Sequence, residues 1–304
     1  MKFPLSKYIW FDGKFVPVNM AKVPVTTHAI HYGTSIFEGI RAYWNSNLYV
    51  FRLKDHVKRF RNSGKFYNIK LNFSDRQIEN AVIDLCKKNK IRKSCYIRPF
   101  YFVGQYGINF HVTQKAPTHT AIFTFPFGDL FNKSGITATI SKWRKFSDMS
   151  TPTQAKMGGN YLNSILATQD AKQRGFDEAI LLDQSGNVSE APGENIFLVK
   201  NNMLVTPSLS SSALDGITRR SIITLAKDMK LKIKTQKVSK KELKMADEIF
   251  LSGTAAEITP VIKIDKKKIG EGKVGNITKL FMDTYSNIVM NKSENYSHWL
   301  TTVY

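Results

Sequence analysis

The stretch Thr153-Gln154-Ala155-Lys156-Met157-Gly158-Gly159-Asn160-Tyr161 places a lysine and a tyrosine on either side of a glycine pair. A lysine that attacks a carbonyl needs surroundings that lower its pKa from about 10.4, so that part of the amine is neutral. It also needs small neighbours, because a flat cofactor must lie against the backbone. Gly158 and Gly159 supply that space, and the phenol of Tyr161 offers a hydrogen bond to a cofactor oxygen.

The same stretch has a simpler interpretation. The chain has 45 lysines and arginines in 304 residues, and most such side chains lie at the surface of a protein. A Gly-Gly pair before a helix is usually only a turn. The stretch therefore gains its meaning from motifs elsewhere in the chain.

Composition sets the limits of the prediction. A length of 304 residues allows a large core in one or two domains. No apolar run approaches the ~18 residues of a membrane helix, and the first ten residues hold no stretch typical of a signal peptide. Cys86 and Cys95 form neither a disulfide framework nor a metal pattern. We expect a cytoplasmic protein with no membrane partner.

The net charge of +21 raises the possibility of a nucleic-acid partner. The lysines are spread along the chain, however, and the densest run is Lys266-Lys267-Lys268. Zinc-ligand spacings and aromatic-basic RNA signatures are missing from the sequence. A basic enzyme that attracts anionic substrates explains the charge equally well. We expect no nucleic-acid partner, and a basic binding protein remains the rival from a different functional class.

The pattern of apolar residues predicts an α+β protein of two domains. We expect a small α/β domain over residues 1–126, an interdomain loop over 127–135 and a large domain over 136–304. A hairpin is predicted where Asp12-Gly13 joins residues 8–11 to 14–16. Further strands are expected at residues 48–51, 96–103, 120–125, 137–141, 179–182, 195–199, 203–205 and 248–251.

Helix signals occupy the intervening segments. Capping boxes open helices at Ser74 and Ser239. Asp55 is expected to cap a helix that carries Arg59, and another helix is expected over residues 217–229. The helix that follows Asn160 is expected to bury its apolar residues, Leu162, Ile165 and Leu166.

Four further clusters contain candidate binding groups. Glu190, in a Ser-Glu-Ala-Pro-Gly-Glu-Asn loop, could keep a pyridine nitrogen protonated, or it could be a simple acidic loop residue. The segments 214–219 and 252–257 each offer free N–H groups and a hydroxyl to an anion, or form an ordinary helix start and a tight turn. Arg98 lies on the same strand face as Tyr96 and needs an anion, either a substrate or a structural carboxylate.

Together with Lys156 and Tyr161, these clusters supply an amine, a phenol, a carboxylate, two possible phosphate-binding segments (214–219 and 252–257) and an arginine. This inventory suits pyridoxal 5'-phosphate. A metal site is not expected, because His28 and His31 lack an obvious third ligand. A serine hydrolase is disfavoured because the sequence contains no Gly-x-Ser-x-Gly.

The chain closely resembles the branched-chain amino-acid aminotransferases, which are class IV aminotransferases with the D-amino-acid-aminotransferase-like pyridoxal-phosphate fold type IV. The likeness runs nearly end to end. The motifs that carry it are His31-Tyr32-Gly33-Thr34-Ser35-Ile36-Phe37-Glu38-Gly39-Ile40-Arg41, Tyr96-Ile97-Arg98-Pro99, Ala155-Lys156-Met157-Gly158-Gly159-Asn160-Tyr161, Glu190-Ala191-Pro192-Gly193-Glu194-Asn195, Gly216-Ile217-Thr218-Arg219 and Ser252-Gly253-Thr254-Ala255-Ala256-Glu257.

This resemblance implies a role for each matching residue. Lys156 is the catalytic residue, which holds the cofactor covalently and moves the substrate proton. The remaining cofactor-binding residues are Tyr161 at O3′, Glu190 at the pyridine nitrogen, Leu214 against the ring, and Arg59, Ile217, Thr218 and Thr254 at the phosphate. The substrate-binding residues are Tyr96, Thr254 and Ala255 at the α-carboxylate, Arg98 at the side-chain carboxylate of glutamate, and Tyr32, Phe37 and Phe127 around apolar side chains.

The implied reaction is transamination of L-leucine, L-isoleucine and L-valine with 2-oxoglutarate, in two half-reactions with ping-pong kinetics. The resemblance also implies self-association, as a dimer or hexamer, with sites walled partly by the partner's small domain. Phe127, Leu130 and Asp215 depart from the tryptophan, tyrosine and proline common in relatives, which puts the ranking of substrates in question. D-amino-acid aminotransferase and aminodeoxychorismate lyase are the rival members of the same fold type.

Overall fold

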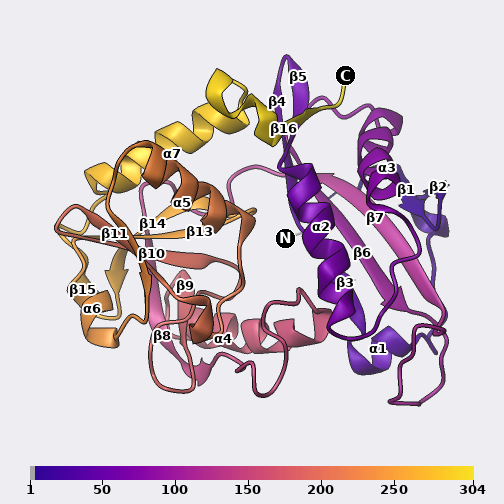
Figure 1. Ribbon diagram of the computed structural model, residues 1–304, viewed down its shortest axis with the longest axis horizontal. Helices are drawn as coiled ribbons and strands as arrows, with labels where there is room; N and C mark the ends of the chain where they lie inside the picture. Colours follow the sequence, from indigo (N-terminus) through magenta and orange to yellow (C-terminus); the bar gives the residue numbers. More distant parts are fainter. Residues whose placement is uncertain (1–3) are drawn as a thin grey trace. The chain divides into compact units, whose positions relative to one another are not determined.

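The computed structural model describes residues 4–304, so residues 1–3 of the predicted first domain lie outside the described residues. The chain forms two compact units (Figure 1). The first unit holds the residues up to Gly128, Ala155–Gly159 and Asn287–Tyr304, and the second holds Asp129–Gln154 and Asn160–Ser286. Compared with the predicted domains, the short segment around Lys156 and the C-terminal residues lie in the first unit rather than the second.

An antiparallel sheet forms the centre of the first unit, in the order β16-β5-β4-β6-β7-β1-β2, with β3 paired to β6. Its strands are β1 (Tyr8–Phe11), β2 (Lys14–Pro17), β3 (Ser35–Phe37), β4 (Ile40–Asn45), β5 (Asn47–Phe51), β6 (Cys95–Val103), β7 (Thr118–Pro126) and β16 (Leu300–Thr302). The helices of this unit are α1 (His28–Tyr32), α2 (Leu53–Lys65) and α3 (Asp75–Lys88).

Helices α2 and α3 cover one face of this sheet (Figure 1). Helix α2 buries Val57 and Phe60, and α3 buries Ile78, Val82 and Leu85, in one cluster with apolar residues of β4, β5 and β6. The spacing of three and four residues puts these side chains on one side of each helix. The neighbouring stripe of α2 carries the polar residues His56, Arg59 and Ser63, which belong to the candidate site.

The segment Ala155–Gly159 lies against β3. Met157 forms a β-bridge with Ile36, and the N–H of Phe37 donates to the carbonyl of Lys156 at 3.2 Å. Gly159 donates its N–H to the carbonyl of Gly33 at 3.2 Å. A Cβ on Gly158 would lie 2.2 Å from the hydroxyl of Ser35, and one on Gly33 would lie 2.9 Å from the Cα of Gly159. The glycines therefore permit this close approach, and Ser35 occupies the space beside Gly158.

A mixed sheet forms the centre of the second unit, in the order β12-β11-β10-β13-β14-β8-β9, with β15 paired to β14. Its strands are β8 (Ile136–Arg144), β9 (Glu178–Leu182), β10 (Asn195–Lys200), β11 (Met203–Pro207), β12 (Ile233–Gln236), β13 (Glu248–Gly253), β14 (Glu257–Ile264) and β15 (Lys267–Lys268). The accompanying helices are α4 (Tyr161–Gln173), α5 (Ile217–Asp228), α6 (Lys240–Lys244) and α7 (Asn276–Val289).

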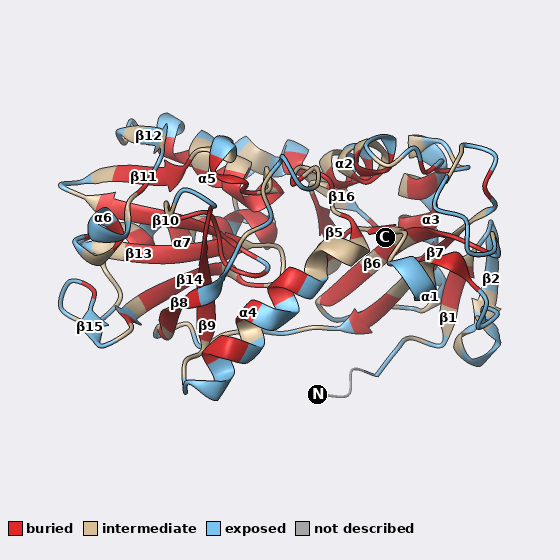
Figure 2. Ribbon diagram, turned by 90° about the horizontal axis from the view of Figure 1, so that it is seen from below, coloured by how far each residue is buried: buried red, intermediate tan, exposed pale blue. Residues whose placement is uncertain are grey.

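Both faces of this second sheet are buried, which explains why its strands are apolar without alternation. On β10, Ile196 and Leu198 join one core cluster, whereas Phe197 points to the other face and stacks on Phe250 at 5.1 Å. Phe250 in turn contacts Phe281 of α7. Figure 2 shows the buried residues running along these strands.

Most predicted elements are confirmed. The Asp12-Gly13 hairpin pairs Tyr8 with Pro17 and Phe11 with Lys14. Both capping boxes are complete, with Ser74 bonded to Gln77 and Ser239 bonded to Glu242. Each predicted strand lies within an observed strand. The fold is α+β, as expected.

Two local predictions are wrong. Asp55 does not cap α2, since the helix begins at Leu53 and Asp55 accepts a hydrogen bond from Arg52 at 2.8 Å. Leu162, Ile165 and Leu166 of α4 are exposed, not buried. The face of α4 that packs against β8 and β9 carries the small residues Ala167 and Ala171.

Gly64 lets α2 approach β6. A Cβ at this position would lie 1.8 Å from the hydroxyl of Tyr101 and 2.6 Å from the carbonyl of Ile69, so neither neighbour can yield easily. We expect Gly64→Ala to lower the free energy of unfolding by about 2 kcal/mol, as overpacking typically does. Urea unfolding followed by circular dichroism measures the change. Gly128→Ala, where a Cβ meets no atom within 4 Å, is the matched control, and equal stabilities of the two variants would contradict the interpretation.

Candidate active site

The backbone of Lys156 is fixed by hydrogen bonds on both sides. Its N–H donates to the hydroxyl of Ser63 on α2 at 3.0 Å, and its carbonyl accepts from Phe37 of β3. The side chain then reaches the ring of Phe37, with Nζ 4.8 Å from the ring centroid. The amine is therefore held at a defined place next to β3 and α2.

The surroundings of Lys156 lower its pKa to about 8. Burial is the largest cause, because it disfavours the ammonium form, and the positive charges of Arg59 and Arg98 act in the same direction. Glu38 opposes them. At pH 7 about one amine in ten is then neutral, against roughly one in 2,500 for an ordinary lysine. This is the property that a lysine nucleophile needs.

Next to Lys156, three side chains form a buried charge network. Arg59 donates from Nε to Oε1 of Glu38 at 2.6 Å and from Nη2 to Oε2 at 3.0 Å. Nδ1 of His56 lies 2.7 Å from Oε2 of the same carboxylate. Glu38 is completely buried. Burial raises the pKa of Glu38, but Arg59 and His56 outweigh it and hold the pKa far below its usual range.

The predicted substrate residues of β6 also lie in this unit. Nη2 of Arg98 donates to the hydroxyl of Tyr96 at 3.3 Å, and its guanidinium carbon lies 4.7 Å from the ring centroid of Phe37. Nε of Arg98 is buried and has no hydrogen-bond partner among residues 4–304. A buried N–H without a partner is costly in a folded protein and suits a site that receives an anion.

Aromatic rings extend this cluster toward the predicted interdomain loop. Phe127 lies 5.3 Å from the ring of Tyr96 and 5.9 Å from that of Phe125. Of the residues predicted to surround apolar side chains, Phe37 contacts Arg98 and Phe127 contacts Tyr96. Tyr32 lies at the end of α1, where its ring contacts Phe110 at 5.1 Å, and it is part of an exposed apolar surface.

In the second unit, Glu190 is the centre of a compact cluster. Its Oε1 lies 2.6 Å from Nζ of Lys145, and its Oε2 accepts the N–H of Leu214 at 2.9 Å and the amide of Asn195 at 3.2 Å. Burial lowers the pKa of Lys145, but Glu190 raises it by more, so this lysine stays charged. Glu190 is therefore an oriented carboxylate rather than a mobile loop residue.

The two predicted phosphate-binding segments, 214–219 and 252–257, lie in this unit as well. Helix α5 begins at Ile217 after an N-cap glycine, and Ile217 and Thr218 lie in its first turn, where N–H groups lack helical partners. The loop before it is held by Gln154, whose side chain donates to the carbonyl of Ala213 and accepts the N–H of Asp215. Thr254 and Ala255 lie in the turn that joins β13 to β14.

The predicted site residues thus fall into two sets, one in each unit, with Tyr32 in the first. Lys156, Arg59, Phe37, Tyr96, Arg98 and Phe127 belong to the first unit, and Tyr161, Glu190, Leu214, Ile217, Thr218, Thr254 and Ala255 belong to the second. Tyr161 is the first residue of α4 and contributes to the electrostatic environment of Lys145.

Sequence reasoning gave no role to Glu38, His56, Ser63 or Lys145. Glu38 stands inside a recognised motif, and a glutamate followed by Gly-Ile-Arg offered a signal for it. His56 and Ser63 lie on α2 three residues before and four residues after Arg59, so a helical projection from Arg59 could have found them. Lys145 carries no local signal, because its partner Glu190 is remote in the sequence.

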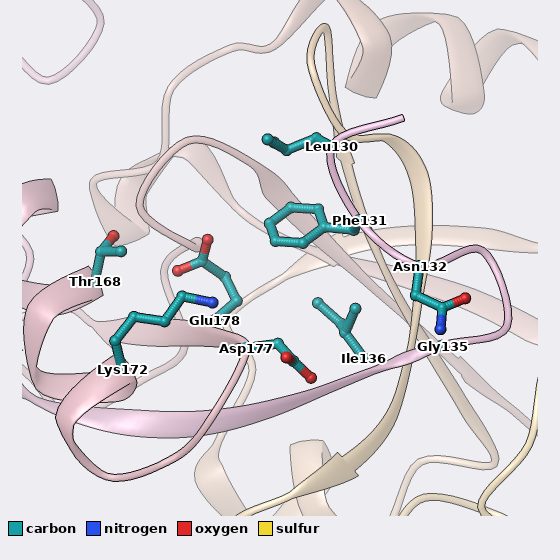
Figure 3. Close-up of a pocket in the computed structure, with 9 residues that line it drawn as sticks. All are labelled: Leu130, Phe131, Asn132, Gly135, Ile136, Thr168, Lys172, Asp177 and Glu178. Atoms are coloured by element: carbon teal, nitrogen blue, oxygen red, sulfur yellow. The ribbon is translucent and has the colours of Figure 1, made fainter. Parts of the chain in front are cut away.

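A separate pocket of about 460 Å³ opens in the second unit (Figure 3). Its walls include Leu130, Phe131, Ile136, Lys172 and Glu178. Burial raises the pKa of Glu178 to about 7, and its Oε1 accepts the N–H of Ala179. The predicted cofactor and substrate residues do not line this pocket, so it is distinct from the candidate site.

Residues 4–304 contain neither a metal centre nor a membrane-spanning helix. Within that range no three His, Cys, Asp or Glu side chains come together as a group that could hold a metal ion. Over the same residues, every helix is too short or too polar to span a bilayer.

Comparisons with known proteins identify the family. Residues 35–264 match the family described as amino-transferase class IV. The branched-chain-amino-acid aminotransferase of Escherichia coli (strain K12) is 42% identical over 303 residues, which is 98% of each chain.

Solved structures give the same result. The branched-chain aminotransferase of the thermophilic archaeon Thermoproteus uzoniensis, solved with norvaline, has a TM-score of 0.95 at 40% identity, with 98% of this chain and 100% of that chain covered. The branched-chain amino acid aminotransferase of Thermobaculum terrenum, solved in its PLP-form, has a TM-score of 0.93 at 33% identity, with 99% of each chain covered.

The family match defines the protein as a class IV aminotransferase. The near-complete coverage by relatives of one kind narrows the assignment, and the chain belongs to the branched-chain-amino-acid aminotransferase family. The family and the fold expected from the sequence motifs are thereby confirmed, in preference to the rival members of the same fold type.

The lowered pKa of Lys156 leads to a measurable prediction. In protein freed of any cofactor, acylation of Lys156 at increasing pH should reach half its maximal rate near pH 8, because only the neutral amine reacts. Mass spectrometry of the peptide that contains Lys156 measures the rate. Fully exposed lysines in the same digest provide the control, with half-maximal rates near pH ~10.4. A midpoint for Lys156 that coincides with theirs would refute the role of its surroundings.

Proposed function

We propose that the chain transfers the amino group of L-leucine, L-isoleucine and L-valine to 2-oxoglutarate, with pyridoxal 5'-phosphate bound at Lys156. The observation that carries the proposal is the placement of Lys156, with its pKa lowered to about 8, within reach of the charges of Arg59 and Arg98. A surface lysine of a basic binding protein would have neither this burial nor this environment.

The residues present fit the cofactor. Lys156 would hold it covalently, Glu190 would meet the pyridine nitrogen and Tyr161 would bond the ring oxygen. Arg59, the N–H groups of Ile217 and Thr218, and the hydroxyls of Thr218 and Thr254 would bind the phosphate, with Leu214 against the ring. A buried carboxylate already oriented by Lys145, Asn195 and the Leu214 N–H suits the nitrogen of a pyridinium ring.

When bound, pyridoxal phosphate supplies an electron sink that stabilises negative charge at the substrate Cα. The protein contributes proton transfer and orientation. Nζ of Lys156, once released from the cofactor, would take the Cα proton, since its lowered pKa leaves part of it neutral. Tyr96, Thr254 and Ala255 would hold the α-carboxylate. Glu190 would keep the ring nitrogen protonated.

Substrate selection follows from the aromatic cluster around Arg98. Phe37, Tyr96 and Phe127 offer apolar surface to leucine, isoleucine and valine. Arg98 offers a cation to the side-chain carboxylate of glutamate and 2-oxoglutarate, with its Nε unpaired among residues 4–304. One site can then serve both substrates of a ping-pong reaction.

Removal of the amine tests the catalytic assignment. Lys156→Ala should lower leucine–2-oxoglutarate transamination below the detection limit, because the amine proposed to hold the cofactor covalently is removed. Borohydride reduction of the wild type followed by peptide mapping should place the cofactor on Lys156. The variant should keep its melting temperature, since the hydrogen bonds that join this position to α2 and β3 are made by its backbone. Turnover by the variant, or a label on another lysine, would refute the proposal.

Removal of the guanidinium tests substrate selection. Arg98→Ala should lower kcat/KM for glutamate and 2-oxoglutarate by about a hundredfold, as expected when a charged contact is lost, and for leucine by less than about tenfold. Steady-state assays with both donors give the ratio. Equal losses for glutamate and leucine would remove Arg98 from this role.

We also propose that the chain self-associates, as a dimer or hexamer. Ile108 and Phe110 are 78% and 81% exposed in the first unit, and Phe110 contacts the half-exposed Tyr32. In the second unit, Leu162, Ile165 and Leu166 of α4 are also exposed. Exposed apolar surface of this kind is typical of an interaction site. Tyr32 would then help to form the wall of the partner's site.

The cytoplasm remains the proposed location, with Cys86 and Cys95 free and buried.

A charge in this surface should weaken the association. We expect wild-type protein to sediment as a dimer or larger species and Phe110→Glu to shift toward the monomer by at least about tenfold in dissociation constant. Phe66→Glu, at a phenylalanine that is 55% exposed at the C-terminal end of α2, is the matched control. A monomeric wild type would contradict the proposal, as would identical behaviour of the two variants.

A further inference from the structure

We propose that Glu38 is a positioning residue for cofactor binding: its buried carboxylate fixes the guanidinium of Arg59 in the orientation that receives the phosphate of pyridoxal 5'-phosphate. The inference rests on the proposed function, because it requires that this cofactor binds. It assigns a role to a residue of the first unit that contacts neither substrate nor cofactor in the roles given above.

Four donors converge on the two oxygens of Glu38. They are Nε and Nη2 of Arg59, Nδ1 of His56 and the N–H of Gly39, at 2.6, 3.0, 2.7 and 3.2 Å. A bidentate pair between a guanidinium and a carboxylate sets the plane of both groups. The side-on contact uses the Nε edge of Arg59, so the orientation of its Nη1 end is determined by Glu38.

The carboxylate itself is held by His56. Burial lowers the pKa of His56 by more than Glu38 raises it, so the imidazole is neutral. A carboxylate only accepts hydrogen bonds, which requires the single ring proton to lie on Nδ1. His56 and Arg59 are three residues apart on α2 and meet Glu38 from the same helix face. The orientation of Arg59 is thus fixed through two buried side chains.

Charge and position make opposite predictions for Glu38→Gln. Removal of the negative charge alone would leave Arg59 more attractive to a phosphate, and the cofactor would bind more tightly. Loss of positioning has the reverse effect, because an amide turns an NH2 group toward one of the four donors and breaks at least one contact to Arg59 or His56. The sign of the change therefore distinguishes the two effects.

The experiment compares pyridoxal 5'-phosphate with pyridoxal, which lacks the phosphate. Each is titrated into cofactor-free wild type and Glu38→Gln at pH 9, where Lys156 is mostly neutral in the wild type, and binding is followed by absorbance. We expect pyridoxal phosphate to bind about tenfold more weakly to the variant and pyridoxal to bind within about twofold of the wild type. Asp75→Asn, at a half-exposed carboxylate paired with Arg61, should change neither affinity.

A second variant applies if Glu38→Gln does not fold. His56→Gln removes the imidazole that holds Glu38 but keeps the ion pair, and it should weaken the binding of pyridoxal phosphate by about threefold without affecting that of pyridoxal.

If Glu38→Gln folds, the Arg59→Lys background provides a further test, because lysine cannot form the bidentate contact. In that background, Glu38→Gln should weaken the binding of pyridoxal phosphate by less than about twofold. A tenfold loss in that background would overturn the inference.

The outcomes separate the inference from the proposed function. A wild type that binds no pyridoxal phosphate overturns both. A wild type that binds it, with unchanged or tighter binding by Glu38→Gln, overturns only the positioning role. Equal losses for pyridoxal phosphate and pyridoxal also overturn it, since a merely structural residue would affect both ligands.

Discussion

The main-chain pairing of Ala155–Gly159 with β3 is the constraint on which the candidate site depends. It places the backbone of Lys156 between Ser63 of α2 and Phe37 of β3, so the amine starts from a fixed point. The approach is possible because Gly33 and Gly158 carry no Cβ where Gly159 and Ser35 lie. Since these contacts do not involve the lysine side chain, its chemistry can be removed without removing the fold that positions it.

Electrostatic balance is the second requirement of this unit. Lys156, Arg59 and Arg98 are near one another, and burial adds to the cost of keeping three cations together. Part of that cost is useful, because it lowers the pKa of Lys156. Glu38 limits this electrostatic cost, because its buried carboxylate pairs with Arg59 and compensates the positive charge of the guanidinium. The same carboxylate is also held by His56. The unit can thus contain a lysine of lowered pKa beside two arginines.

Local signals in the sequence predicted what is local in the structure. The Asp12-Gly13 turn and the two capping boxes are confirmed because each is made by residues a few positions apart. The networks around Glu38 and Glu190 were not predicted, because they join strands, loops and helices that only the tertiary fold brings together. The exposure of α4 was mispredicted for another reason. Periodicity shows that a helix has apolar residues, but α4 buries its small alanines and exposes its large residues.

The contact between Arg98 and Phe37 offers a physical account of the proposed dual substrate specificity. The guanidinium of Arg98 lies 4.7 Å from the ring centroid of Phe37, in a cation–π contact worth about 0.5–1 kcal/mol. An apolar substrate side chain would leave this contact in place, because it forms neither a hydrogen bond nor an ion pair with the guanidinium. A substrate carboxylate offers a charge-assisted hydrogen bond of about 1.5–3 kcal/mol, to which the buried Nε can contribute. In the proposed function, this exchange would be favourable only for the acidic substrate, so the same arginine would tolerate leucine and select glutamate.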